Sequence, residues 1–576
     1  MTVSSEAAIP PALERSSRRA WLLALVLSLV TALTIISPFT WKGNASGHDF
    51  SFHAASWMDA AAQWHQGIML PRWTAGANYG FGEPRFIFYP PLSWMFGAAL
   101  GLVVPWVYVP AVFIVLTQWM AGLSAFALGR RLFAERGALL CAVAYAANPY
   151  ALLIVYMRSD FAEQLALVFL PLLFLAALEM LGVAKTGVRK NVSPVAFLAI
   201  TFAAVWLTNS PAGVVASYSL AALFVFTAIR SKSYKPLLLG AAALALGFGL
   251  AGFYLVPAIY EQRWVNISQA LASGLQPSQN FLYAIIADSE HNDFNRIASN
   301  TAVVMIGLTG LFAVAGFPRS GNSSRYSVTK AVWTVLLALS VLAAFLMLRL
   351  SNVFWILLPK LCFVQFPWRW MSILAIPFAC LAPAALLQKR KRWHWAAFEI
   401  VAFVAVLAGL ATWMVRRTWW DSEDIPVLRE AIQNDEGFEG VDEYDPANDD
   451  HSSLPQKSAR VTLLAGARES TALSGTRIHV ERWSAETKEL RITAREPVLL
   501  ALRLLNYPAW RIEVNDKVVK PQPPNRETSQ MVVPLPVGSS HVVVRFTRTP
   551  DRTIGGISTS LSVIVLMLFF VRRARS

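Results

Sequence analysis

Apolar segments alternate with short polar segments along most of the 576-residue chain. Each apolar run is near the roughly 20 residues that an α-helix needs to cross a bilayer. The pattern therefore predicts a mainly α-helical, polytopic membrane protein. The apolar runs lie at roughly 21–39, 88–106, 109–129, 137–156, 163–183, 193–208, 212–229, 236–257, 301–317, 330–349, 369–387, 395–414 and 555–571.

Lysine and arginine gather in the short loops between these runs, and such loops face the cytoplasm. The basic loops agree on one side only if the run at 88–106 does not cross. That run begins with Pro90 and Pro91 and contains Gly97, Gly101 and Pro105, which weaken a spanning helix. We therefore expect a re-entrant or juxtamembrane segment there and about twelve transmembrane helices. The N-terminus and the C-terminal tail are predicted to be cytoplasmic, in a multi-pass inner (plasma) membrane protein.

The pattern changes after the twelfth run. Residues 417–459 are acidic and rich in Pro and Gly, which predicts an irregular linker. From 460 to 554 apolar and polar residues alternate with period two between turn signals, as in an antiparallel β-sandwich. The predicted domains are a transmembrane domain at 1–416 with an outer loop at 40–108, the linker, an extracytoplasmic sandwich at 460–554, and a final helix with a basic tail at 555–576.

Composition supports the membrane prediction, with 55% hydrophobic and 15% charged residues. The net charge of +15 does not indicate nucleic acid, because the basic residues lie in loops between apolar runs. Cys141, Cys362 and Cys380 are in or beside apolar segments, so no disulfide framework is expected. The sequence has no glycine-rich nucleotide-binding motif and no workable metal-binding His cluster. We predict no metal or other cofactor, while a divalent ion such as Mg or Mn stays open.

The stretch at 47–91 departs most from the apolar pattern. It holds Gly-His-Asp at 47–49, Arg-Trp at 72–73, Tyr-Gly-Phe-Gly-Glu-Pro at 79–84 and Phe-Tyr-Pro-Pro at 88–91. These motifs resemble the first outer loop of GT-C glycosyltransferases, and most closely that of bacterial proteins labelled "membrane protein, 6-pyruvoyl-tetrahydropterin synthase-related" and of YfhO-like proteins. A Tyr-Pro-Ala-Trp run at 507–510 resembles the C-terminal domain of the YfhO-like proteins.

The resemblance implies a membrane enzyme that uses polyprenyl-phosphate sugars and places its general base early in this loop. Asp49 occupies that position, and a base is what sugar transfer to a hydroxyl requires. The alternative is that Asp49 only caps the following helix. His48 and His53 are candidates to assist it, whereas Asp59 is expected on the wet face of the helix.

Two further motifs resemble this family. Arg158 and Glu163 match a Tyr-x-Arg-x-x-x-x-Glu pattern, which puts Arg158 on the lipid phosphate and Glu163 on the acceptor, a metal or Arg158. The alternative is a helix cap, with Asp160 as the N-cap and Glu163 three residues later. Arg369 closes a Gln-Phe-Pro-Trp-Arg motif, where it either binds phosphate or snorkels within an aromatic belt.

Arg72, Arg85 and Tyr89 complete the substrate-binding candidates. The predicted function is transfer of a sugar from a polyprenyl-phosphate donor to an extracytoplasmic glycan, lipid or protein. A transporter or flippase would place charges deep inside helices, and a non-catalytic assembly or sensor protein would use the sandwich for binding. The expected partners are membrane lipid, the donor and that acceptor.

Overall fold

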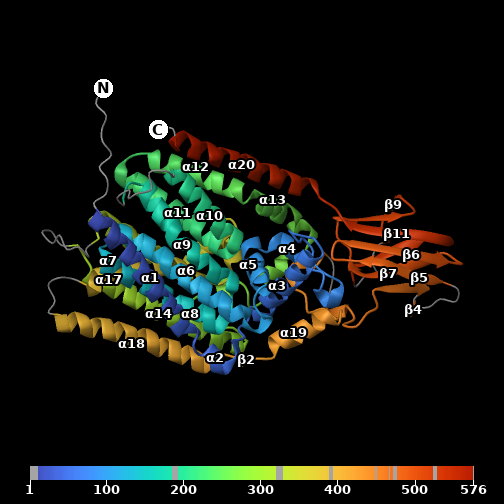
Figure 1. Cartoon of the computed structure of the whole chain (residues 1–576), viewed down its shortest axis with the longest axis horizontal. Helices are drawn as coiled ribbons and strands as arrows, with labels where there is room; N and C mark the ends of the chain where they lie inside the picture. The colour runs from blue at the N-terminus through green and yellow to red at the C-terminus, as the bar shows by residue number, and fades with distance from the viewer. Residues whose placement is uncertain are drawn as a thin grey trace.

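The computed structural model describes residues 11–183, 193–318, 328–387, 393–447, 451–465, 468–470, 476–522 and 528–574. A bundle of long helices makes up most of the molecule, and a β-sandwich extends from one end of it (Figure 1). This arrangement confirms the predicted fold class of a mainly α-helical membrane protein with a C-terminal β-domain. The start of α1 and the end of α20 lie at the opposite end of the bundle from the sandwich.

Nine helices of the described ranges are long and apolar enough to cross a membrane. Two further pairs are bent by 78° and 89° and bring the number to eleven if each pair is one span. The remaining one of the twelve predicted spans, at 193–208, corresponds to α10. Its 15 residues rise only about 22 Å, which is less than the hydrocarbon core of about 30 Å. The long helices are α1 (Pro11–Ile36), α6 (Val109–Leu132), α7 (Glu135–Ala146), α9 (Phe161–Met180), α10 (Pro194–Thr208), α11 (Ser210–Ser231), α12 (Lys235–Leu250), α13 (Gly252–Glu261), α14 (Ser289–Ala315), α15 (Lys330–Leu346), α17 (Met371–Leu386), α18 (Trp393–Arg417) and α20 (Pro550–Ala574).

The first outer loop folds into short helices between α1 and α6. They are α2 (Phe39–Lys42), α3 (Phe50–His65), α4 (Arg85–Phe88) and α5 (Pro91–Gly101). Helix α5 rises only about 16 Å, so it is too short to span, in line with the predicted non-crossing segment. It packs closely on α3, since a Cβ atom on Gly97 would lie 2.3 Å from the Trp57 ring.

The sandwich consists of two antiparallel sheets. Strand β6 shows why its sequence alternates, because Leu490, Ile492 and Ala494 are buried while their neighbours are more exposed. Asn515 and Asp516 both adopt positive φ, as a two-residue hairpin turn between β8 and β9 requires. One sheet has the order β10 (Gln530–Leu535), β7 (Val498–Leu505), β3 (Val461–Ala465), β4 (Arg468–Ser470), and the other β5 (Arg477–Trp483), β6 (Thr487–Ala494), β11 (Gly538–Phe546), β8 (Trp510–Val514), β9 (Lys517–Val519).

The sandwich shares a hydrophobic core with the outer loop. Trp73 packs against Tyr507 and Trp510 at ring distances of 5.8 and 5.4 Å. Below this contact, buried Glu261 accepts hydrogen bonds from Tyr507 at 2.7 Å and from Arg552 at 2.8 and 2.9 Å. The Tyr-Pro-Ala-Trp run of the sequence therefore fixes the sandwich to the bundle.

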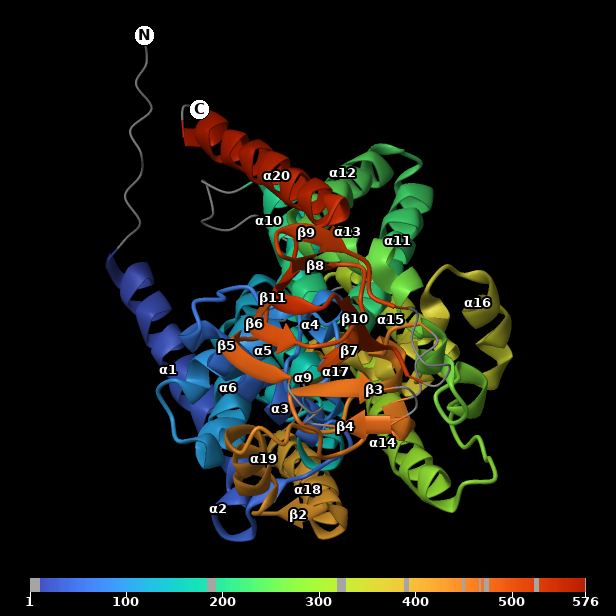
Figure 2. The ribbon, with the colours of Figure 1, turned by 90° about the vertical axis from the view of Figure 1, so that its right-hand side faces the viewer.

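The acidic segment is more regular than the linker that we expected. It contains β2 (Trp420–Asp421), which pairs with β1 (Asn44–Ala45) of the outer loop, and α19 (Asp424–Gln433). Helix α19 contacts α3 and lies below the strands of the sandwich in the view of Figure 2. Most of the predicted basic cytoplasmic loops at 185–190, 319–330 and 389–392 lie outside the described residues, as do residues 575–576.

Candidate active site

Five charged side chains from three distant segments meet at the loop end of the bundle. Asp49 immediately precedes α3. Arg158 ends the short π-helix η3 (Ile154–Arg158), and Asp160 and Glu163 lie at the start of α9. Arg369 belongs to the 3-10 helix η9 (Pro367–Trp370) ahead of α17. We call Asp49, Arg158, Asp160, Glu163 and Arg369 the charged cluster.

Arg158 is the centre of the charged cluster. Its guanidinium nitrogens lie 2.5 Å from Asp49, 3.2 Å from Glu163 and 3.3 Å from Asp160. The side chain is only 4% exposed, so these charges are largely desolvated. A buried cation is tolerated when it is paired in this way.

Arg369 supplies the second positive charge. It lies 3.4 Å from Glu163 and 3.5 Å from Asp160. Aromatic rings hold both arginines from the other side, with Phe366 5.0 Å from Arg369 and Trp368 5.1 Å from Arg158. Such cation–π contacts add to the pairing, so the Gln-Phe-Pro-Trp-Arg motif contributes both a charge and its aromatic support.

The backbone around Arg158 is shaped to receive Asp49. Ser159 adopts a left-handed conformation with φ of 54°, which ends the π-helix and lets α9 begin. The Asp49 N–H donates to the Arg158 carbonyl at 3.0 Å. Gly47 passes so close that a Cβ atom there would lie 2.4 Å from the Arg158 carbonyl carbon, and only glycine fits such an approach.

Asp49 differs from the other four members in its access to solvent. Its side chain is 34% exposed, whereas those of Asp160 and Glu163 are 4% and 1% exposed. Asp49 makes no capping hydrogen bond to α3, so the capping alternative is wrong for this residue. For Asp160 it is confirmed, because its carboxylate accepts from the Glu163 N–H at 2.9 Å.

Asp160 stays ionised despite its burial. Burial alone would raise its pKa, but the neighbouring His53 ring and the positive charges of Arg158 and Arg369 lower that pKa well below its ordinary value. The cluster therefore holds at least one permanent buried anion. This anion fixes the two guanidinium groups in place.

Two more of the predicted residues border the charged cluster. His53 Nε2 lies 3.5 Å from Asp160, and the Tyr89 ring contacts His53 at 5.7 Å. His48 has an exposed side chain and packs edge-on against Phe294 at 4.7 Å. His48 thus lies beside Asp49 on the solvent side, while His53 and Tyr89 lie beneath it.

Arg72 and Arg85 are not brought to the charged cluster. Arg85 is buried against Glu83 at 2.5 Å and donates to Ser56 Oγ at 3.0 Å. Arg72 lies in the electrostatic environment of Glu261 and Arg552, at the junction with the sandwich. The structure therefore gives both residues partners outside the charged cluster, and their role in substrate binding stays a prediction.

The prediction that Asp59 lies on a solvent-exposed face of α3 is wrong. Asp59 is 4% exposed and Gln63 is 1% exposed, because the loop at 73–80 and the sandwich cover this side of the helix. Burial raises the pKa of Asp59, and the hydrogen bond from the Gly76 N–H partly opposes the shift. A helix pattern alone cannot show that a distant domain will fold over its polar face.

Sequence reasoning missed Tyr150, whose hydroxyl lies 2.5 Å from Glu163 Oε1. Its only signal was a tyrosine inside an apolar run, where a buried hydroxyl needs a polar partner. Asp160 was considered only as a cap, although it also contacts both arginines of the charged cluster.

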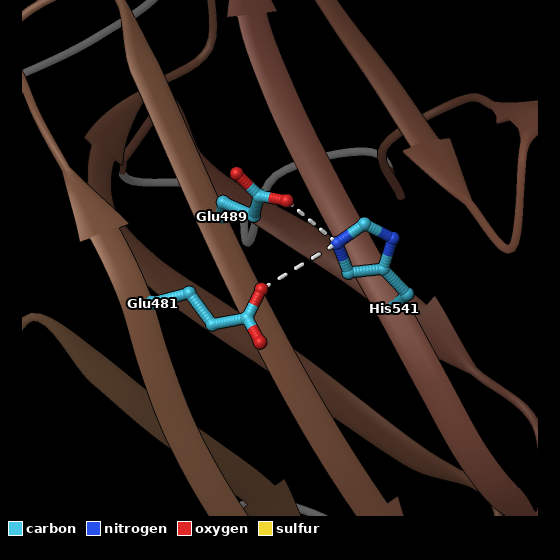
Figure 3. A group of neighbouring side chains, drawn as sticks. All are labelled: Glu481, Glu489 and His541. Carbon is cyan, nitrogen blue, oxygen red and sulfur yellow. Dashed lines mark hydrogen bonds and ion pairs between the residues drawn. The ribbon is translucent and has the colours of Figure 1, made fainter.

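A group of metal-ligand side chains lies elsewhere, on the sandwich. Glu481, Glu489 and His541 come from strands β5, β6 and β11, and their ligand atoms lie within 4.8 Å of one another (Figure 3). His541 Nε2 is 2.9 Å from Glu489, and Arg491 already pairs with Glu481 at 2.5 Å. The prediction from the sequence missed this group, because strand pairing rather than chain spacing brings the residues together.

No protein-family model matches the chain, and no curated protein matches it. Solved structures do share similarity with it. They include the arabinofuranosyltransferase AftD from mycobacteria, at 16% identity and a TM-score of 0.44 over 73% of this chain and 29% of that one. A mutant of AftD matches at 16% identity and a TM-score of 0.43, over 73% of this chain and 30% of that one. ArnT from Cupriavidus metallidurans bound to undecaprenyl phosphate gives 10% identity and a TM-score of 0.29, over 63% and 77% of the two chains. The chain thus spans less than a third of AftD, and with TM-scores below 0.5 these likenesses carry no argument about function.

Proposed function

We propose that this chain is a GT-C-type membrane glycosyltransferase that transfers a sugar from a polyprenyl-phosphate donor to an acceptor outside the cytoplasm. The observation that carries the proposal is the placement of Asp49. It is a partly exposed carboxylate that pairs with buried Arg158, and Asp160 links Arg158 with buried Arg369. The motifs in which Asp49, Arg158 and Arg369 stand are those that resemble the GT-C family.

The chemistry requires two kinds of group. Asp49 takes the proton from the acceptor hydroxyl, whose oxygen attacks the anomeric carbon of the donor sugar. The bond between that carbon and the phosphate oxygen breaks, and the lipid phosphate leaves with the electron pair. This leaving group needs positive charge rather than a proton, and Arg158 and Arg369 supply it.

Donor binding would also free the base. Arg158 now pairs with Asp49, but that ion pair is partly exposed and therefore weak, at roughly 0–1 kcal/mol. A donor phosphate can replace Asp49, because guanidinium groups bind phosphate oxygens in a bidentate manner. Asp49 is then released toward the acceptor, while Asp160 and Glu163 keep the arginine side chains oriented from below. In this role Glu163 is a positioning residue rather than the catalytic group that the sequence suggested.

The apolar residues beyond the charged cluster are compatible with a lipid-linked donor. Leu170, Leu173 and Phe174 of α9 and Ile373 and Ile376 of α17 line one small apolar void. Leu170 is seven residues beyond Glu163, about 10 Å farther along α9. The lipid chain of a donor would run along this apolar surface, outside the void itself.

The charged side chains also argue against a transporter. Arg158, Glu163 and Arg369 stand within a few residues of the ends of candidate spans, whereas transporters place binding residues near the bilayer midplane.

The test is label transfer by purified protein in nanodiscs. The donor is a radiolabelled polyprenyl-phosphate sugar, and the acceptor is the glycan in membranes of cells that lack this protein. Asp49→Asn keeps the shape of the side chain and should lower the transfer rate roughly a hundredfold or more. Asp293→Asn is the matched control, because Asp293 is 66% exposed and its ion pair in the described part of the chain is with Arg296, outside the charged cluster.

Equilibrium binding of polyprenyl phosphate separates the two roles. Asp49→Asn should retain that binding or strengthen it slightly, because the phosphate no longer displaces a carboxylate from Arg158, whereas Arg369→Met should weaken it together with transfer. If Asp49→Asn transfers sugar at the unmodified rate, Asp49 is not the base and the proposed mechanism fails. If no donor sugar is transferred by the unmodified protein, the transporter or assembly function takes its place.

A further inference from the structure

A second polar cleft lies between the outer loop and the sandwich, away from the charged cluster. Its volume is about 220 Å³. This exceeds the roughly 30 Å³ of a water molecule but falls below the roughly 300–1,000 Å³ of pockets for drug-sized ligands. A ligand that fits is therefore small, about the size of a single sugar ring. The lining includes Gln63 and Trp73 from the loop, Asp435 after α19, and Trp483, Lys488 and Arg503 from the sandwich.

Two buried polar atoms of this lining have no hydrogen-bond partner in the described part of the chain. They are the Gln63 Oε1 and the Arg503 Nε, in residues that are 1% and 5% exposed. Leaving such an atom without a partner destabilises the protein, because the atom has lost its hydrogen bonds to water. Each is a place where a bound molecule would recover that loss.

The orientation of the Gln63 amide is fixed by its neighbours. Its Nε2 donates to Asp59 Oδ1 at 2.5 Å and to the Trp73 carbonyl at 2.7 Å. The oxygen is therefore the free end, and it can only accept a hydrogen bond. Arg503 can only donate, so the ligand must offer both a donor and an acceptor.

The charges of the lining largely cancel. Arg503 and Arg460 share the carboxylate of Asp435, with Arg460 at 2.9 Å from it. Burial lowers the pKa of Lys488 to about 7, which reduces the positive charge further near neutral pH. An anion such as phosphate would face the Asp435 carboxylate, so the lining favours a neutral ligand.

The cleft also has an aromatic wall. Trp483 lines it, and the Lys488 ammonium lies 5.3 Å from the Trp483 ring and 5.2 Å from the Trp510 ring. Aromatic faces pack well against the weakly positive C–H groups of a ring. Hydroxyl groups, in turn, both donate and accept.

From this combination we infer that the cleft between α3 and the sandwich is a carbohydrate-binding site for one neutral sugar residue. The inference concerns binding and does not require the transfer reaction. Gln63 lies 14 residues after Asp49, so the rise along α3 places it about 21 Å away. A sugar held there is not the one that reacts at Asp49. If the proposed function also holds, the cleft binds a sugar residue of a long acceptor glycan that is remote from the residue reacting at Asp49.

Binding is measured on the full-length protein in nanodiscs, by saturation-transfer NMR and tryptophan emission. The probes are glucose, galactose, mannose, arabinose and N-acetylglucosamine, with inorganic phosphate as the competing anion. We expect saturable binding of at least one sugar with a Kd near the millimolar range. Trp483→Ala and Gln63→Leu should each weaken it at least tenfold, while Trp483→Phe should retain it.

Trp419→Ala is the control, because Trp419 is 73% exposed and does not line the cleft; it should leave the Kd unchanged. Thermal unfolding of every variant identifies any loss that comes from misfolding, and the comparison of Trp483→Phe with Trp483→Ala then decides. The inference is overturned if no sugar binds, if Trp483→Ala and Gln63→Leu both bind as well as the unmodified protein, or if phosphate binds more tightly than every sugar. Transfer activity plays no part in these outcomes, so failure here is distinct from failure of the proposed function.

Discussion

Removing the Arg158 guanidinium should destabilise the protein mainly through its buried partner Glu163 and only weakly through Asp49. The distances alone suggest the reverse order, since Asp49 is nearer at 2.5 Å than Glu163 at 3.2 Å. Exposure decides between them, because water and salt screen a carboxylate that is 34% exposed far more than one that is 1% exposed.

The magnitudes follow from this difference. Two unit charges about 4 Å apart interact by about 4 kcal/mol at an effective dielectric constant of 20. Arg158→Met leaves Arg369 as the arginine shared by Asp160 and Glu163, so we expect it to cost about 3–5 kcal/mol, as for other broken buried pairs. In double-mutant cycles the coupling of Arg158 with Glu163 should be about 2–3 kcal/mol, and its coupling with Asp49 below about 1 kcal/mol.

Reversible unfolding by SDS in mixed micelles gives the free energies for both cycles, using Arg158→Met, Glu163→Gln and Asp49→Asn. The exposed pair Arg296 and Asp293 is the control cycle and should show roughly 0–0.5 kcal/mol. A coupling of Arg158 with Asp49 as large as that with Glu163 would refute the reasoning, because burial would then not govern these ion pairs.

Three further outcomes are expected. The pKa of Lys488 falls from its ordinary 10.5 to about 7 on folding, so the unfolded state binds more protons between these values and stability should rise with pH there; Lys488→Met should flatten that rise in unfolding titrations. Gly47→Ala forces a Cβ atom against the Arg158 backbone and should lower both the melting temperature and the transfer rate, measured side by side. Tyr507→Phe removes one hydrogen bond to Glu261, and hydrogen exchange should show faster opening at the sandwich junction, at a cost of about 1 kcal/mol.

Much of the fold follows from the apolar runs, because a segment that spans the bilayer must satisfy its own backbone hydrogen bonds and therefore forms a helix. The period-two pattern likewise predicts the sandwich. Asp49, Arg158 and Glu163 were found as separate motifs, since a charge beside a membrane span is rarely accidental. The prediction failed for the exposure of Asp59, which tertiary contacts bury. It also gave no sign of the contacts that place Arg85 against Glu83 and Arg72 near Glu261 and Arg552.

The cleft between α3 and the sandwich could not be predicted from the sequence for the same reason. Its lining draws on α3 and the loop after it at 59–80, on the end of α19 and the segment after it, and on strands β5, β6 and β7. The first of these parts is hundreds of residues from the others in the chain. No spacing rule connects Gln63 with Arg503, and the acidic segment between them was expected to be irregular. Sequence periodicity describes which face of an element is apolar, but not which distant element covers the other face.

The π-helix that ends at Arg158 has a consequence for where the chain tolerates a change of length. A π-turn takes one residue more than an α-turn for about the same rotation, so deleting one residue between 154 and 157 would let the segment relax to an α-helix with Arg158 on nearly the same face. In α9, by contrast, each residue advances the side chains by about 100°, so deleting Phe161 or Ala162 would turn Glu163 away relative to Asp160. All five members of the charged cluster would remain in the sequence, yet Glu163 would no longer meet both arginines. A gap of one position is therefore harmful after Asp160 and tolerable before Arg158.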